Sequence, residues 1–265
     1  MGIRVRMARI ITLLTDFGTA DYFVGAMKGE ILCRAPDVHL VDLSHEIRPH
    51  DILHGAFVLR HAYAHFPPET IHVFVVDPGV GSQRRPVAVR ANGYYFVGPD
   101  NGLLKLLLDE SPFEAVVLDR PEWFRPEVSR TFHGRDIFAP VAAHLANGVP
   151  LEALGSPIRE LTPAQWTRPI RGDAYIVGQI LHVDRFGNLI TNIRPEDLPP
   201  NRTPVFTAKD LRCRGLVPAY AAVDPGQALA IVGSAGFIEL AIREGSAAGV
   251  FDLKVGQRVL VSWEP

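Results

Sequence analysis

The segment from Thr70 to Arg85, TIHVFVVDPGVGSQRR, constrains the fold of this chain more than any other. It opens as a run of β-branched and aromatic residues, which predicts a strand buried on both faces of a sheet. The run stops at Asp77, and a glycine-rich turn then leads to Arg84 and Arg85. A carboxylate at the carboxyl end of a strand lies where open α/β sheets build ligand sites. We therefore expect Asp77 to lie in a site and to be held ionised by these arginines. The alternative is a structural ion pair at an ordinary strand end.

The composition excludes several classes of protein. The chain has 265 residues, of which 47% are apolar and 21% charged, as is typical of a globular protein with a sizeable core. Its formal net charge of −2 predicts no bulk attraction to nucleic acid or to anionic membranes. Cys33 and Cys213 lie far apart in the sequence, which argues against a disulfide framework and indicates a cytoplasmic location. The apolar run near the N-terminus is too short to span a membrane, and we expect it to form the first strand.

Strand and helix patterns alternate along the first part of the chain. This alternation predicts an α/β domain with a largely parallel sheet over residues 8–160. Within it, Asn92-Gly93 is a strong signal for a β-hairpin. We expect strands at 9–15 and 39–43 and a third strand that ends at Asp77. We expect helices at 21–34, 52–65, 101–109 and 136–147. Asp21 should cap the first of these helices, and Pro36 should stop it.

The sequence pattern changes after this α/β region. Residues 161–173 are rich in proline and polar residues and have no clear period, so we expect a linker there. From 174 to 265, short β-rich runs are separated by Gly, Pro and Asp. This pattern predicts a second, smaller all-β domain, a barrel or a sandwich.

Two further segments of the first domain carry candidate site residues. Asp16 ends the first expected strand much as Asp77 ends the third, so the two carboxylates should meet at one edge of the sheet. A carboxylate there commonly accepts hydrogen bonds from ribose hydroxyls, whereas the alternative role is to cap a turn. His133 precedes a glycine and an expected helix, and Arg135 and Asp136 follow it closely. A lone histidine is more often structural, but this polar group among apolar residues makes His133 a candidate catalytic residue.

A run of histidines requires separate consideration as a metal site. His54, His61 and His65 could share one face of the helix expected at 52–65, and His61 and His65 are four residues apart. No H-E-x-x-H motif is present, and no carboxylate lies between them on that helix. The pattern therefore favours a solvated helix face, and we expect no metal site.

Two turns of the second domain carry residues suited to binding a nucleoside. The first, DRFGN, presents Asp184, Phe186 and Asn188. An aromatic ring can stack on a base, and an asparagine amide can pair with the edge of adenine. The second, GSAGFIE, presents Ser234 and Glu239. The alternative is that these are ordinary barrel turns, which favour the same residue types.

Six segments, in order, resemble one family over nearly the whole chain, from about Arg9 to Trp263. They are TDFGTADYFVGAMKG, VDPGVG, VGPDNG, TFHGRDIFAP, DRFGNLITNI and GSAGFIELAIREGSAA. Together they look like the S-adenosylmethionine hydrolases, also called SAM hydroxide adenosyltransferases, which are relatives of the fluorinases and chlorinases. The resemblance implies an α/β domain followed by a β-barrel domain. It also implies a homotrimer, in which the substrate binds between the first domain of one subunit and the second domain of the next.

The resemblance further implies a reaction and a set of site residues. Water would attack C5′ of S-adenosylmethionine, expelling methionine and leaving adenosine, with no cofactor. An Asp-Arg-His trio orients and activates that water, and Asp77, Arg84 and His133 match it. The resemblance also implies contacts with each part of the substrate. Asp16 would bind the ribose, Asn188 and the backbone near Ala247 the edge of adenine, and Phe186 would lie beside the purine. Asp184 and Ser234 would bind the amino and carboxylate groups of methionine, with Glu239 close by.

Departures from the halide-using relatives favour water as the nucleophile. The halide-using enzymes carry Tyr where this chain has His133, and the fluorinase carries Ser where this chain has Gly134. The halide-using enzymes also lack the Asp-Arg-His trio. The fluorinase also has an extra loop for which there is no room between Pro86 and Glu114. The resemblance suggests a preference for the sulfur epimer that methyltransferases do not use.

Three other functions stay open: a non-catalytic nucleoside-binding protein, a 5′-halogenase, and a metal-dependent hydrolase.

Overall fold

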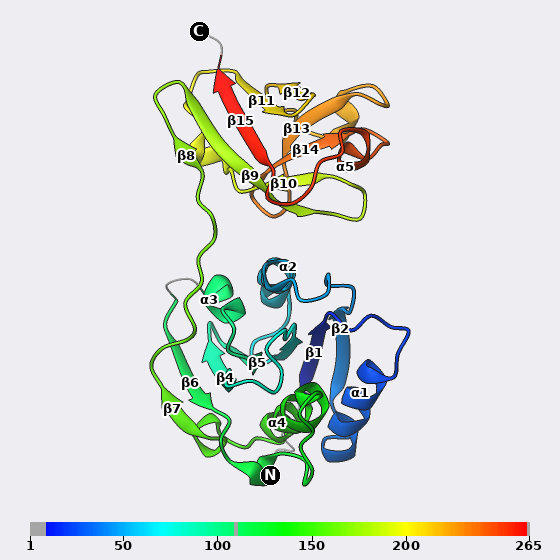
Figure 1. Ribbon diagram of the computed structural model, residues 1–265, viewed down its shortest axis with the longest axis vertical. Helices are drawn as coiled ribbons and strands as arrows, with labels where there is room; N and C mark the ends of the chain where they lie inside the picture. The colour runs from blue at the N-terminus through cyan, green and yellow to red at the C-terminus, as the bar shows by residue number, and fades with distance from the viewer. Residues whose placement is uncertain (1–8, 109–110, 264–265) are drawn as a thin grey trace, which may run out of the picture. The chain divides into compact units, whose positions relative to one another are not determined.

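The computed structural model describes residues 9–108 and 111–263, which belong to two compact units. The first unit is Met1–Gln165 and the second is Trp166–Pro265 (Figure 1). Their boundary falls inside the segment 161–173 that the sequence marks as a linker. Among the described residues, no helix has both the length and the apolar character needed to cross a membrane.

The first unit contains a mixed sheet, so the expected α/β class is confirmed. The strands β2, β1, β3 and β5 run parallel to one another, while β4 pairs antiparallel with β5 and β6, and β6 with β7. The antiparallel part begins at the hairpin Asn92-Gly93, where both residues have positive φ, as a type I′ turn requires. The strands are β1 (Ile10–Thr15), β2 (His39–Ser44), β3 (Ile71–Val75), β4 (Pro86–Ala91), β5 (Tyr94–Pro99), β6 (Phe113–Val117) and β7 (Ser156–Ile158).

Helices cover the sheet in two pairs: α1 (Phe23–Arg34) packs against α4 (Ala139–Ala146), and α2 (Ile52–Ala62) against α3 (Leu103–Leu108). Successive residues of a strand face opposite sides of a sheet. Leu13 accordingly lies in the core with α1 and α4, whereas Leu14 lies beside Gly55 of α2. The two pairs therefore cover opposite faces.

The helix ends differ from the sequence-based prediction in instructive ways. Asp21 lies one residue too early to cap α1; Tyr22 occupies the cap position, and no side chain caps the helix. The helix expected at 52–65 is α2, capped by Asp51, followed by a 3₁₀ turn over Tyr63–His65. The helix expected at 136–147 begins instead with a π-helical turn, Gly134–Phe138, directly after His133. Residue 109, at the end of the helix expected at 101–109, lies outside the described residues.

The second unit is a nearly closed antiparallel barrel, as the sequence predicts. Its sheet runs in the order β12-β11-β15-β9-β10-β14-β13, with β8 paired to β9, and β12 lies next to β13. Inward-facing side chains such as Phe206, Leu240 and Val261 fill it. The strands are β8 (Ile170–Arg171), β9 (Tyr175–Val183), β10 (Leu189–Thr191), β11 (Pro204–Ala208), β12 (Leu211–Arg214), β13 (Ala228–Val232), β14 (Ile238–Ile242) and β15 (Arg258–Trp263), and the short helix α5 spans Ala247–Val250.

Candidate active site

Asp77 lies just beyond the fully buried strand β3 and is held by Arg84. The guanidinium Nε donates to both carboxylate oxygens at 3.0 Å, and Nη2 donates to Oδ2 at 2.5 Å. The side chains of Asp77 and Arg84 are only 4% and 9% exposed. A bidentate pair of this kind fixes the orientation of the carboxylate as well as its charge. The loop between them passes so close to residue 130 that a Cβ on Gly81 would lie 2.5 Å from the carbonyl oxygen of Arg130.

Arg84 also contacts His133, so the structure brings the three residues of the expected trio together. Its Nη2 lies 2.7 Å from Nδ1 of His133, and because a guanidinium only donates, Nδ1 is the acceptor. Burial and the Arg84 charge lower the pKa of His133, and Asp77, Asp136 and a backbone hydrogen bond to Ser129 offset this only in part. His133 is therefore a neutral imidazole at pH 7.

Arg85 does not take part, which corrects the expectation that both arginines hold Asp77. Its guanidinium instead donates to Oδ2 of Asp100 at 3.0 and 2.5 Å. Neighbouring residues of an extended segment point to opposite sides, so Arg84 and Arg85 reach different partners. Asp100, whose side chain is 1% exposed, also accepts from the backbone of Thr162. This second pair is structural and fastens the segment near residue 162 to the end of β5 within the first unit.

A cavity of about 310 Å³ lies at this end of the first sheet. Asp16 and Asp77 both line it, as expected from the parallel pairing that sets Thr15 beside Val75. Oδ2 of Asp16 accepts from the backbone N–H of His50 at 2.8 Å. The other lining residues include Phe17, Phe132, His133 and Gly134. The cavity thus combines two carboxylates and an imidazole with aromatic walls.

His50 is a lining residue that the sequence did not single out as part of this site. Its backbone has a φ of 66°, a left-handed conformation that is uncommon outside glycine. That conformation directs its N–H at Asp16 and leaves the other Asp16 oxygen free to accept from a ligand. No residue pattern marks a histidine for this role, so only the folded backbone reveals it.

The second unit has its own cavity, of about 680 Å³, and most of the residues expected to bind substrate line it. Oδ1 of Asp184 accepts from the backbone N–H groups of Phe186 and Asn188, and Oδ2 accepts from Nδ2 of Asn188, all at 2.9 Å. The turn thereby orients the Asn188 amide while leaving its oxygen and one N–H for a ligand. The Phe186 ring is 76% exposed, and Ser234 also lines the cavity.

Glu239 is a buried carboxylate of this cavity, and Tyr220 is the partner that the sequence did not reveal. The Tyr220 hydroxyl donates to Oε1 of Glu239. Burial raises the pKa of Glu239, the nearby charge of Asp184 raises it further, and the hydrogen bond from Tyr220 lowers it in part. A Cβ on Gly233 would lie 2.7 Å from Oε2, so any larger residue there would displace the end of the Glu239 side chain.

Ala247 lies beneath the cavity rather than on its surface. It is fully buried at the start of α5, where the Ser246 side chain caps the helix. Glu244 and Gly245 line the cavity just before it. The residues near Ala247 that line the cavity are therefore Glu244 and Gly245.

The histidines weighed as metal ligands have other surroundings. Nδ1 of His54 accepts from the backbone of Arg48 at 3.1 Å, and the ring of His61 lies 4.6 Å from that of Phe57. Residues 9–108 and 111–263 contain no group of three or more His, Cys, Asp or Glu side chains arranged to hold a metal ion.

Two family models match the chain, one for each unit. The model of the SAM hydroxide adenosyltransferase N-terminal domain matches residues 11–155, and that of its C-terminal domain matches residues 178–260. An (R)-S-adenosyl-L-methionine hydrolase of Methanocaldococcus jannaschii is 41% identical over 75% of this chain and 73% of its own length. The enzyme of the same name from Thermus thermophilus is 39% identical over 95% of this chain and 98% of its own length.

More distant relatives and solved structures share nearly the full length. A fluorinase of Nocardia brasiliensis is 30% identical over 95% of this chain and 96% of its own. The crystal structure of a conserved protein from Thermotoga maritima, 33% identical, covers 95% of this chain and 99% of that one with a TM-score of 0.88.

Proposed function

The chain belongs to the SAM hydroxide adenosyltransferase family, and from this premise we propose that it hydrolyses S-adenosyl-L-methionine to adenosine and L-methionine. The hydrolases named above, 39–41% identical, support this activity. The observation that carries it is the single guanidinium of Arg84 that joins Asp77 to His133 at the wall of a cavity.

The proposed step is an in-line displacement at C5′. A water oxygen bonds to C5′ while the C5′–S bond breaks and the sulfur keeps the electron pair. The water gives up one proton, which is finally released to solvent. Because the sulfonium is already a good leaving group, the protein mainly has to place and orient the water. Arg84 fills only part of the acceptor capacity of Asp77, so this carboxylate can also accept from the water. His133, neutral at pH 7, completes the polar wall.

The remaining contacts divide between the two cavities. We assign the ribose hydroxyls to Asp16, the adenine edge to Asn188 and the backbone near Ala247, and the purine face to Phe186. Asp184, Ser234 and Glu239 would meet the amino and carboxylate groups of methionine. The (R) epimer at sulfur is the proposed substrate, as the names of the relatives suggest.

Replacing the proposed water-orienting residues tests the function. Asp77→Ala and His133→Ala should each abolish adenosine release, measured by chromatography, while calorimetry shows that the substrate still binds. His65→Ala makes the same change at an exposed histidine and should leave turnover unaltered. Full turnover in both variants contradicts the assigned roles. Intact substrate after prolonged incubation of the parent protein would instead support a non-catalytic binder.

The same assay tests for a 5′-halogenase and for a metal-dependent hydrolase. Supplied chloride or fluoride should give no 5′-halo-5′-deoxyadenosine, because the site is proposed to use water. A chelator should leave the rate unchanged, since the proposed step needs no metal or other cofactor. Purified sulfur epimers should react at different rates, with the (R) form faster.

We also propose that the protein is a cytoplasmic homotrimer whose subunits share their active sites. Light scattering after size-exclusion chromatography measures the trimer. If one subunit supplies the trio and the next supplies the barrel residues, mixing Asp77→Ala with Asn188→Ala subunits should restore part of the activity. A monomer with full activity would contradict this arrangement.

A further inference from the structure

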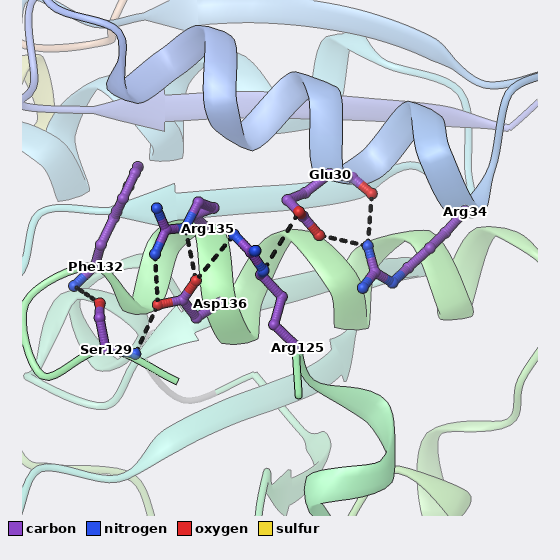
Figure 2. A network of polar contacts seen from close by, with 7 residues as sticks. All are labelled: Glu30, Arg34, Arg125, Ser129, Phe132, Arg135 and Asp136. Atoms are coloured by element: carbon purple, nitrogen blue, oxygen red, sulfur yellow. Dashed lines mark hydrogen bonds and ion pairs between the residues drawn. The ribbon is translucent and has the colours of Figure 1, made fainter. Parts of the chain in front are cut away.

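Asp136 is a fully buried carboxylate close to His133, and the proposed reaction does not use it directly. It lies in the π-helical turn Gly134–Phe138, a rare geometry that is often found at functional sites. Figure 2 shows its partners: Arg135 donates through Nε at 2.7 Å and Nη2 at 3.2 Å, and the backbone N–H of Ser129 donates at 2.9 Å. Burying a carboxylate is unfavourable unless it is paired and hydrogen-bonded, so this one fixes its surroundings.

The loop that Asp136 holds is the one that carries His133. Oγ of Ser129 accepts from the backbone N–H of Phe132 at 3.0 Å, and the backbone N–H of Asp136 donates to the carbonyl of Phe132 at 3.1 Å. The braced loop leads directly into His133, whose Nδ1 meets Nη2 of Arg84 at 2.7 Å. Asp136 therefore holds the loop that positions the imidazole against Arg84.

The contact with Arg84 defines the protonation pattern of the ring. Nδ1 accepts from Arg84, whose guanidinium can only donate, so Nδ1 carries no proton. A neutral imidazole has only one N–H, so the proton must lie on Nε2. The tautomer of a histidine is often set in this way by the partner on its other nitrogen.

We propose that Asp136 is a positioning residue for the reaction: by anchoring the loop from Ser129 to Phe132, it fixes the orientation and tautomer of His133. This inference rests on the proposed function, because it gives His133 its role. The carboxylate itself is not among the residues that line the cavity and is not assigned any contact with substrate.

A purely structural role is the competing explanation, and the network itself supplies the control. Arg125 lies 3.6 Å from Asp136 and 3.4 Å from Glu30, and Glu30 pairs with Arg34 at 2.5 Å, so the outer part of the network ties this region to α1 (Figure 2). Glu30→Gln weakens that tie without touching the loop of His133. Asp136→Asn removes the inner carboxylate charge.

The two variants are compared by steady-state kinetics across pH. Asp136→Asn should lower kcat by about ten-fold or more with KM within two-fold, since small displacements of a reacting group are costly. The charged groups that face His133 are Arg84, Asp77 and Asp136. Because the Asp136 charge raises the pKa of His133, its removal should move the acid limb of the kcat profile to lower pH. Glu30→Gln should leave kcat and the acid limb unchanged.

Nitrogen-15 NMR of the His133 ring, assigned with His133→Asn, tests the inference without any turnover. The parent should show the Nε2-protonated neutral tautomer and Asp136→Asn a mixture of the two. Ser129→Ala removes the hydroxyl that braces the same loop and takes the place of Asp136→Asn if that variant does not fold. An unchanged kcat, acid limb and tautomer in a folded variant would overturn the proposal. If the parent forms no adenosine, the proposed function is refuted. The role of Asp136 in orienting His133 is still tested in that case, because the NMR comparison needs no turnover.

Discussion

Lowering the pH should destabilise the first unit through His72, a histidine buried inside its sheet. The ring is fully buried, stacks on Phe96 with 5.4 Å between centroids and lies 5.5 Å from the ring of Tyr94. Nδ1 is 2.7 Å from the hydroxyl of Thr12, and no described residue forms a hydrogen bond with Nε2. Burial lowers the pKa of His72 from its ordinary 6.5 to about 4.

The size of the effect follows from these two pKa values. The unfolded chain takes up a proton on His72 as the pH falls through 6.5, whereas the folded protein resists protonation until about pH 4. The depressed folded-state pKa therefore gives stability that is complete above pH 6.5 and is lost as the pH falls. One pKa unit corresponds to about 1.36 kcal/mol, so the loss between pH 7 and pH 4 is about 3 kcal/mol. That is a large share of the stability of a typical domain.

A paired substitution isolates this contribution. Thr12→Val with His72→Phe replaces the polar pair by apolar side chains. Urea unfolding at pH 7 and pH 4 can be followed through Trp123 after the two tryptophans of the second unit are changed to phenylalanine. The loss of unfolding free energy on acidification should be about 3 kcal/mol smaller in the variant than in the parent. His39→Gln changes an exposed histidine and should preserve the parent behaviour. An equal loss in parent and paired variant would refute the reasoning.

Three further substitutions test the local geometry. Arg84→Lys keeps the charge but loses the planar fork that reaches both Asp77 and the imidazole, so kcat for adenosine formation should fall about 100-fold. Arg85→Met leaves Asp100 buried without its cation, and urea unfolding should show a loss of about 3 kcal/mol while kcat of the folded enzyme is unchanged. Gly187→Ala places a Cβ 2.0 Å from the Ser246 hydroxyl at a φ of +84°, and steady-state assays should show a raised KM.

Each of these expectations has a definite contradiction. Normal turnover in Arg84→Lys would show that the bidentate geometry is not needed. A loss of kcat in folded Arg85→Met would give Arg85 a functional role that its pairing with Asp100 does not suggest. An unaltered KM in Gly187→Ala would mean that the turn from Asp184 to Asn188 does not bind substrate.

The site contacts that could be predicted from the sequence are those between residues close together in the chain. Asp77 and Arg84 are seven residues apart across a glycine-rich turn, so their pairing follows from local geometry. The Asn92-Gly93 hairpin is equally local and was predicted, but the order of the strands around it depends on packing across the sheet. The prediction that Arg85 holds Asp77 is wrong although its true partner is local: the hairpin pairs Pro86 of β4 with Pro99 of β5 and so sets Arg85 beside Asp100.

The remaining site residues depend on contacts that no local pattern encodes. Tyr220 donates to Glu239 from a 3₁₀ turn nineteen residues away, and nothing in the sequence around it distinguishes it from other surface tyrosines. His50 contributes through its backbone rather than its side chain. The contact of adenine with the backbone near Ala247 comes from the family motif alone and stays a prediction, with Glu244 and Gly245 lining the cavity just before it.

Incubation of the protein with S-adenosyl-L-methionine in oxygen-18 water tests the central claim most directly. Attack of water at C5′ predicts adenosine with one heavy oxygen in its 5′-hydroxyl, together with unlabelled methionine, both read by mass spectrometry. Label in homoserine beside 5′-methylthioadenosine, or no labelled adenosine at all, would contradict the account.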